Sequence, residues 1–347
     1  MRVALAQLNP VVGDVAGNLK LILDAIEQAQ CDGADVLVTS ELGLIGYPPR
    51  DLLLREGVVE ACERAVEVIA HAAGSMWVLV GHPRRQEGGT RPLRNSVSVC
   101  RAGRVAAVYD KRLLPGYDVF DEDRYFEPGD ATVVIEMAGV RCGIVVCEDL
   151  WRANDVTAVR RYPIEPMAEI AKQGADLIIS LNASPFVLGK WQKHLRQLGD
   201  IARETNLPVI AVNQVGANDD QIFDGRSVII APDGRATQVM AGFVSETRTF
   251  EIAAPGGGGA SPERLHATAS EIDTWSDSSR ELFHALTLGI RDYAHKTGHR
   301  TMLLGLSGGI DSALAAVLEV PVAILASGLL SVVLYLLLVR VKSLEAL

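Results

Sequence analysis

The chain has 347 residues, 48% of them apolar, enough to bury the core of one large domain or two ordinary ones. It carries 33 basic and 43 acidic residues, a formal net charge of −10. Nucleic-acid binding needs a concentrated positive face, so this balance argues against a nucleic-acid partner. The five cysteines lack CxxC spacing and fit neither a disulfide framework nor a zinc knuckle, and we expect a reducing, cytoplasmic compartment.

Short apolar runs alternate with helical patterns along most of the chain. The first run is too short for a signal peptide and predicts a strand. The predicted strands are 3–8, 36–39, 77–81, 96–101, 105–109, 132–136, 142–146, 177–181, 209–212 and 227–230. The predicted helices are 18–30, 58–73, 162–173, 191–204 and 279–295. Several strands are apolar on both faces, which predicts an α/β protein whose sheets are covered by helices.

The composition changes near residue 255. The string PGGGGASP, residues 255–262, is typical of a linker. We therefore expect a first domain at 1–254, a linker at 255–276 and the start of a second domain at 277–318.

Three polar residues directly follow apolar strands, where sites of α/β proteins assemble. Cys147 can supply a thiolate nucleophile, Glu41 a base for its proton, and Lys111 a cation for an oxyanion, with the backbone N–H of Glu148 as second donor. Structural alternatives remain open for all three: a buried core cysteine for Cys147, an acid at a helix N-terminus for Glu41 and a solvated surface lysine for Lys111.

Longer strings surround these residues. They are GYPPRDLL (46–53), KRLLPGYDVFDEDRYFEPG (111–129), CEDLW (147–151) and NASPF (182–186). In this order they resemble the glutaminase domain of glutamine-dependent NAD synthetases, a branch of the carbon-nitrogen hydrolase (nitrilase) superfamily. The resemblance covers about residues 1–255 and implies a four-layer α-β-β-α sandwich.

The resemblance also implies roles. Glu41 is the general base, Lys111 stabilises the intermediate, and Cys147 forms a thioester with the acyl group of glutamine, from which water releases glutamate. This half of the reaction needs no metal or cofactor. Glu122 matches an acid that supports Lys111, although a solvated surface acid is the alternative.

Further positions match the glutamine pocket of the family. Tyr117 and Phe120 match residues that line it. Ser184 and Lys190 match residues that hold the α-amino and carboxylate end, although an ordinary loop serine and helix-start lysine are equally compatible. For Tyr47 a packing role is as compatible as a binding role. Residues 152–166 look longer than the family pattern, which weakens the alignment of Ser184 and Lys190.

A second motif, SGGIDS, joins a predicted strand to a predicted helix. It resembles the pyrophosphate-binding loop of ATP pyrophosphatases, with a plain Gly-rich turn as the alternative. The loop residues are Ser307, Gly308, Gly309, Asp311 and Ser312. The resemblance implies a fragment of an α/β domain that uses ATP and magnesium to activate nicotinate adenine dinucleotide, which ammonia from the first domain converts to NAD. It also implies a homo-oligomer.

From Glu319 the sequence departs from this family. Residues 320–339 form an uncharged apolar stretch of membrane-spanning length. A frameshift or truncation is favoured over a membrane anchor, because the change falls inside a helix that the family would continue. We therefore expect the glutaminase half alone to be competent. The rival readings are a free-standing nitrilase-type amidase and a non-catalytic fragment.

Overall fold

The computed structural model describes residues 1–86, 88–151, 162, 164–252, 278–299, 305 and 309–319. The chain divides into two compact units, Met1–Ala285 and Leu286–Leu347. The predicted linker at 255–276 and the predicted tail beyond Glu319 lie outside the described residues. The predicted domain limits therefore stay a prediction.

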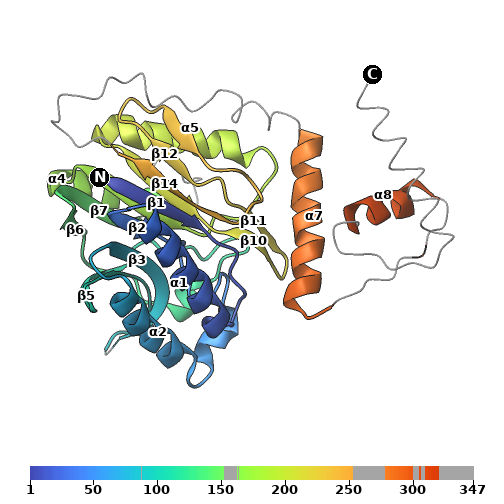
Figure 1. Ribbon diagram of the computed structural model, residues 1–347, viewed down its shortest axis with the longest axis horizontal. Helices are drawn as coiled ribbons and strands as arrows, with labels where there is room; N and C mark the ends of the chain where they lie inside the picture. Colours follow the sequence, from blue (N-terminus) through green and yellow to red (C-terminus); the bar gives the residue numbers. More distant parts are fainter. Residues whose placement is uncertain are drawn as a thin grey trace. The chain divides into compact units, whose positions relative to one another are not determined.

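Two six-stranded mixed sheets form the first unit (Figure 1). In order, the first sheet contains β14 (Glu246–Glu251), β1 (Arg2–Gln7), β2 (Val36–Val38), β3 (Trp77–Arg85), β4 (Leu93–Arg101) and β5 (Arg104–Asp110). The second contains β13 (Ala236–Val239), β12 (Val228–Ile230), β9 (Val209–Asn213), β8 (Leu177–Asn182), β7 (Val140–Val146) and β6 (Val133–Met137). A separate hairpin pairs β10 (Val215–Asn218) with β11 (Gln221–Asp224). Strands β1–β3 and β7–β9 are parallel within their sheets.

Alternation along β1 shows how the layers pack. Val3 and Leu5 join one core cluster with residues of the second sheet, whereas Ala4 and Ala6 join another cluster with residues of α1 (Val15–Cys31) and α2 (Val58–Ala72). Helices α4 (Pro166–Lys172) and α5 (Lys190–Thr205) contribute to the core on the second sheet. Because side chains alternate between the faces of a strand, both faces of β1 are buried. The predicted four-layer α-β-β-α sandwich is confirmed.

Most predicted elements are confirmed, with local causes that the sequence shows. The Asp14 carboxylate caps α1 by accepting from the Gly17 N–H at 2.9 Å. Positive φ angles at Ala102 and Gly103 close the β4–β5 hairpin. The helix predicted at 162–173 begins only at Pro166, because proline suits the first turn of a helix and not its interior. The predictions missed β10, β11, β13 and β14, which are short or polar, and the short α3 (Glu122–Tyr125), η1 (Arg50–Leu54) and η2 (Cys147–Leu150).

Two further helices lie in the C-terminal part. Helix α7 (Ser278–Lys296) confirms the helix predicted at 279–295, and α8 (Ile310–Glu319) begins inside the SGGIDS motif. In the portion of the chain that the structure describes, no helix is long and apolar enough to span a membrane. The apolar stretch at 320–339 lies outside that portion.

Candidate active site

The three residues predicted to carry the chemistry follow strands of both sheets. Glu41 comes after β2 and Lys111 directly after β5, both in the first sheet, and Cys147 directly follows β7 of the second. Their charges act on one another, since Glu41 and Lys111 both affect the pKa of the Cys147 thiol. The structure therefore brings together residues that are far apart in the sequence.

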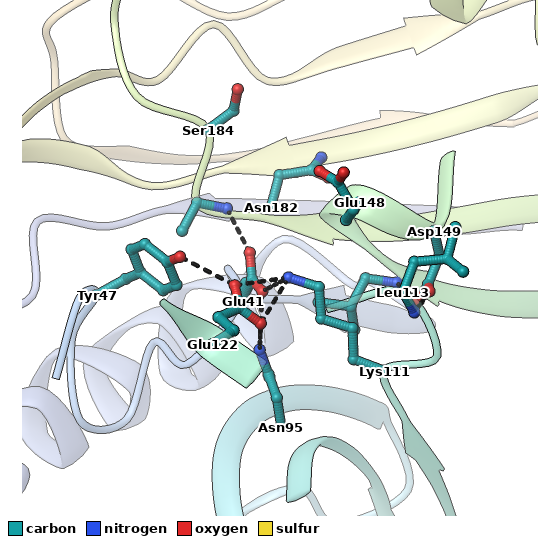
Figure 2. A network of polar contacts seen from close by, with 12 residues as sticks. Glu41, Tyr47, Asn95, Lys111, Leu113, Glu122, Glu148, Asp149, Asn182 and Ser184 are labelled. Atoms are coloured by element: carbon teal, nitrogen blue, oxygen red, sulfur yellow. Dashed lines mark hydrogen bonds and ion pairs between the residues drawn. The ribbon is translucent and has the colours of Figure 1, made fainter. Parts of the chain in front are cut away.

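Lys111 lies between two carboxylates, as Figure 2 shows. Its Nζ donates to Glu41 Oε1 at 2.6 Å and to Glu122 Oε1 and Oε2 at 2.8 and 2.9 Å. All three residues are buried, with relative exposures of 1% for Glu41 and Lys111 and 4% for Glu122. Lys111 is thus not a solvated lysine, nor Glu122 a solvated acid. We call these three residues the charge cluster.

Neutral donors complete the hydrogen bonding of both carboxylates. Asn95 Nδ2 donates to Glu41 Oε1 at 2.8 Å and to Glu122 Oε2 at 3.3 Å. The Tyr47 hydroxyl donates to Glu122 Oε1 at 2.9 Å, and the backbone N–H of Ala183 donates to Glu41 Oε2 at 3.1 Å. Every carboxylate oxygen of the charge cluster therefore accepts at least one hydrogen bond. The sequence analysis missed Asn95, because β4 holds other polar residues, such as Ser96 and Ser98, and nothing in the sequence distinguishes Asn95 from them.

The charge cluster fixes the protonation of its lysine. Burial by itself lowers the pKa of Lys111, but the charges of Glu122 and Glu41 outweigh burial and raise that pKa well above its usual value. Burial raises the pKa of Glu122 to about 7; the Lys111 charge opposes this rise and the Glu41 charge adds to it. Lys111 is therefore an ammonium at neutral pH.

Cys147 has a constrained backbone and a neutral resting thiol. Its φ of 41° lies in the left-handed region, which is uncommon for a residue other than glycine and occurs often at functional sites. Burial, followed by the charge of Glu41, raises the pKa of the thiol well above its usual value, although Lys111 opposes the rise. The residue is partly exposed and lines a cavity together with Trp151, Asn182, Ser184 and Lys190, among others.

Asp149 joins the segments that carry Lys111 and Cys147. Its Oδ1 accepts from the backbone N–H groups of Arg112 and Leu113 at 3.0 and 2.8 Å. Its Oδ2 accepts from the Val146 N–H at 3.0 Å and from the Tyr109 hydroxyl at 2.8 Å. Asp149 has no exposed surface, and burial raises its pKa to about 6. Nothing in the sequence separated this acid from its neighbour Glu148.

Glu148 follows Cys147 directly, and its carboxylate accepts hydrogen bonds from two tyrosines. The Tyr117 hydroxyl donates to both carboxylate oxygens at 3.1 Å, and the Tyr162 hydroxyl donates to Oε1 at 2.7 Å. Phe120 packs edge-on against Tyr117, with ring centroids 5.5 Å apart. Tyr117 therefore contacts the residue that follows Cys147, and Phe120 packs against Tyr117; their place in the glutamine pocket stays a prediction.

Ser184 and Lys190 lie together on the wall of the cavity. Lys190 Nζ donates to Ser184 Oγ at 2.8 Å and to the Pro185 carbonyl at 3.0 Å. Figure 2 shows the Ser184 side chain pointing away from Glu41, while the N–H of the preceding Ala183 points toward it. The chain at 183–184 thus contacts the charge cluster on one side and the cavity on the other.

Two glycines allow the close approach of backbones that this arrangement requires. A Cβ at Gly81 of β3 would lie 2.4 Å from the Ser40 carbonyl and 3.0 Å from Glu41 Cα. A Cβ at Gly129 would lie 2.1 Å from the carbonyl of Asp110, next to Lys111. A larger residue at Gly81 would displace the segment that carries Glu41, and one at Gly129 would displace the segment that carries Lys111.

Part of the SGGIDS loop falls in the described residues. Gly309, Asp311 and Ser312 lie at the start of α8, where the Ser312 hydroxyl donates to the Gly309 carbonyl at 3.0 Å. Ser307 and Gly308 lie outside the described residues. The described residues hold no group of three or more His, Cys, Asp or Glu side chains that could bind a metal ion.

Sequence comparisons match two families. The profile of the carbon-nitrogen hydrolase family matches residues 2–255, and the profile of the NAD synthase family matches residues 282–334. A glutamine-dependent NAD(+) synthetase from Synechocystis sp. is 38% identical over 325 residues. That alignment covers 92% of this chain and 57% of the relative, so the chain spans little more than half the length of the curated relatives it matches.

Solved structures give a similar result. The glutamine-dependent NAD+ synthetase from Acinetobacter baumannii, solved with adenosine diphosphate, has a TM-score of 0.78 and 30% identity, covering 92% of this chain and 56% of that one. An amidase variant from Nesterenkonia sp. AN1 has a TM-score of 0.63 and 25% identity, covering 73% and 90%. In that structure the acetamide moiety of fluoroacetamide is added covalently at the active-site cysteine.

Proposed function

The chain belongs to the carbon-nitrogen hydrolase family, and we propose that its first domain hydrolyses the side-chain amide of glutamine. One observation carries the proposal. A buried lysine is shared by two carboxylates in the charge cluster, beside a cysteine that opens on a cavity. A nucleophile, a base and a cation within one site are the groups that amide hydrolysis through a thioester requires.

In the first half of the proposed reaction, Cys147 Sγ attacks the amide carbon. Because burial keeps the thiol neutral, Glu41 takes the proton as the new bond forms. The Lys111 ammonium and the backbone N–H of Glu148 stabilise the negative charge on the oxygen of the tetrahedral intermediate. The C–N bond then breaks, Glu41 passes its proton to the departing nitrogen, and ammonia leaves behind a thioester.

The second half reverses these proton transfers. Glu41 takes a proton from a water molecule, which attacks the thioester carbonyl, and Lys111 again stabilises the oxyanion. As the C–S bond breaks, Glu41 passes this proton to the departing sulfur, which releases glutamate and restores the thiol of Cys147. Glu122 holds the ammonium of Lys111 in place throughout, because its two oxygens both accept from Nζ.

The fate of the ammonia follows from the relatives. The Synechocystis and Acinetobacter relatives are glutamine-dependent NAD synthetases, and residues 282–334 match the NAD synthase profile. We therefore propose that this chain derives from an enzyme in which the ammonia amidates nicotinate adenine dinucleotide to NAD with ATP and magnesium. The N–H groups at the start of α8 would hold the pyrophosphate of ATP, and magnesium would then be bound mainly by phosphate oxygens, since the described residues hold no cluster of three or more His, Cys, Asp or Glu side chains. Homo-oligomerisation and a cytoplasmic location stay predictions.

A second candidate is an amidase that acts on other small amides. The amidase from Nesterenkonia sp. AN1 supports it, because this chain covers 90% of that structure. The two candidates differ in whether the enzyme needs the α-amino and carboxylate groups of an amino acid. A panel of glutamine, asparagine and acetamide separates them.

The decisive experiment is ammonia release from that panel by the purified chain and by Cys147→Ala. We expect release from glutamine that disappears in Cys147→Ala and persists in Cys31→Ala, which changes an exposed cysteine instead. Preference for acetamide would favour the second candidate. A folded chain that releases no ammonia from any of the three amides would refute the amidase proposal and favour a non-catalytic fragment.

A further inference from the structure

Two adjoining cavities meet at Lys190. Both are lined by Asn182, Ser184, Lys190 and His194. Cys147 lines one of them, and Asp224 with its neighbours lines the other. The cavity beside Cys147 and the cavity beside Asp224 therefore adjoin at Lys190.

Asp224, at the end of β11, brings a carboxylate to the far cavity. Its side chain is 13% exposed, and its Oδ2 lies 3.4 Å from Nη1 of Arg226. That guanidinium has a shorter contact with Glu281 Oε1, at 2.6 Å, so much of its charge is balanced there. Burial raises the pKa of Asp224 to about 6, against the charges of Arg226 and Lys190. The carboxylate thus lies in a place where additional positive charge would be favourable.

Lys190, the first residue of α5, brings the opposite charge. An ammonium has three N–H donors, and Lys190 directs hydrogen bonds to Ser184 Oγ and the Pro185 carbonyl. Both of these acceptors are neutral, and burial lowers the pKa of Lys190 against the opposing charges of Cys147, Asp224 and Glu148. A bound anion would therefore stabilise this buried ammonium.

We propose that Asp224 is a specificity residue that binds the α-ammonium group of an α-amino-acid amide, beside Lys190, which the family resemblance already assigns to the amino-acid end and which would face the α-carboxylate. The inference rests on the amidase function proposed above and deepens it. One wall of the cavity then carries a negative and a positive side chain for the two charges of a zwitterion. Simple amides have neither charge and gain nothing from these side chains, so the wall selects for an amino-acid amide such as glutamine.

The test compares glutamine with glutaramate, which lacks only the α-amino group. Losing a charged hydrogen bond costs ~1.5–3 kcal/mol, so Asp224→Asn should lower kcat/KM for glutamine about 10- to 100-fold, mainly through KM. The value for glutaramate should change by less than about threefold, because that substrate never contacts Asp224 through an ammonium. Asp233→Asn, in an exposed turn, is the matched control and should leave both values unchanged.

Equal losses of kcat/KM on both substrates would assign Asp224 a structural role. No loss of kcat/KM on either substrate would show that Asp224 does not contact the α-ammonium. Either result overturns the inference. Lys190→Gln provides an independent variant, with γ-aminobutyramide as the analogue lacking the carboxylate. It should lower kcat/KM for glutamine and not for this analogue.

Calorimetry on the Cys147→Ala chain keeps the inference separate from the amidase proposal. Binding of glutamine should be tighter than binding of glutaramate even without turnover, and Asp224→Asn in this background should remove the difference. If the chain with Cys147 intact releases no ammonia, such a binding result would retain the recognition site and reject the amidase. Equal binding of both compounds would reject the recognition site alone.

Discussion

The charge cluster and the cavity wall formed by Lys190 and Asp224 both contain carboxylates and an ammonium, but these groups differ in how fully they are hydrogen-bonded. In the charge cluster, every oxygen of Glu41 and Glu122 accepts at least one hydrogen bond, and the ammonium of Lys111 is shared between them. On the cavity wall, Asp224 has an ion pair of 3.4 Å, and Lys190 donates to neutral acceptors.

This difference separates two tasks. Groups that must stabilise a transition state work best when they are held in place before the substrate arrives, since no energy is then lost in reorienting them. Groups that recognise a substrate must still be able to form hydrogen bonds or ion pairs with it. Variants of the charge cluster test whether it is held as rigidly as its hydrogen bonds indicate.

Lys111→Met should have the largest effect. Removing one partner of a buried ion pair leaves uncompensated charge and costs roughly 3–5 kcal/mol, and here two carboxylates lose the same cation. Loss of an oxyanion donor also lowers kcat by about 10²–10³-fold. Urea unfolding and ammonia release measure the two effects.

The matched control for this variant is Lys20→Met. The Lys20 side chain is 74% exposed and pairs with Asp24 one helical turn away, so its removal should cost under ~1 kcal/mol. Near-normal turnover by Lys111→Met would show that another group stabilises the oxyanion.

Glu122→Gln should change how stability depends on pH. The pKa of Glu122 is raised from 4.5 to about 7 in the folded chain. At pH values between 4.5 and about 7 the folded chain therefore binds a proton that the unfolded chain does not. The stability that Glu122 contributes is thus present at low pH and is lost as the pH rises through this window. The loss is on the order of 3 kcal/mol, and the glutamine variant should not show it. Urea unfolding of both proteins below and above this pH window measures the difference. Parallel pH profiles would mean that Glu122 is ionised across the whole window.

The sequence indicated the three residues of the proposed reaction but not the residues that hold them in place. Glu41, Lys111 and Cys147 could be found because each follows an apolar strand, and family strings begin at Lys111 and Cys147 and shortly after Glu41. Asn95 and Asp149 could not, because their roles depend on which strands become neighbours and which backbone N–H groups then face them. The fold class and the longer elements follow from apolar periodicity, whereas the polar strand β14 is defined mainly by its pairing with β1.

Asp224 shows the same limit. It ends β11, a strand of four residues that periodicity does not reveal, and its place in the cavity depends on that hairpin. Recognition residues contributed by short irregular segments are therefore harder to predict than catalytic residues at the ends of core strands.

Asp149→Asn should have the smallest effect of the three, and it tests whether the positions of Lys111 and Cys147 are coupled. All four groups that contact this carboxylate are donors, so an amide NH₂ would face a donor whichever way it turned. The segments after β5 and β7 should shift relative to each other, and a displacement of about 1 Å can cost 10²-fold in rate. We therefore expect kcat to fall about 10- to 100-fold with KM nearly unchanged, because the cavity wall does not include Asp149.

Asp176→Asn is the comparison that isolates this coupling. Asp176 also accepts a backbone N–H, from Arg141 at 3.0 Å, but in an exposed setting away from the charge cluster. Its variant should keep both kcat and KM. If Asp149→Asn instead raised KM, or lost stability without losing kcat, Asp149 would support the fold in general and would not position the nucleophile against the lysine.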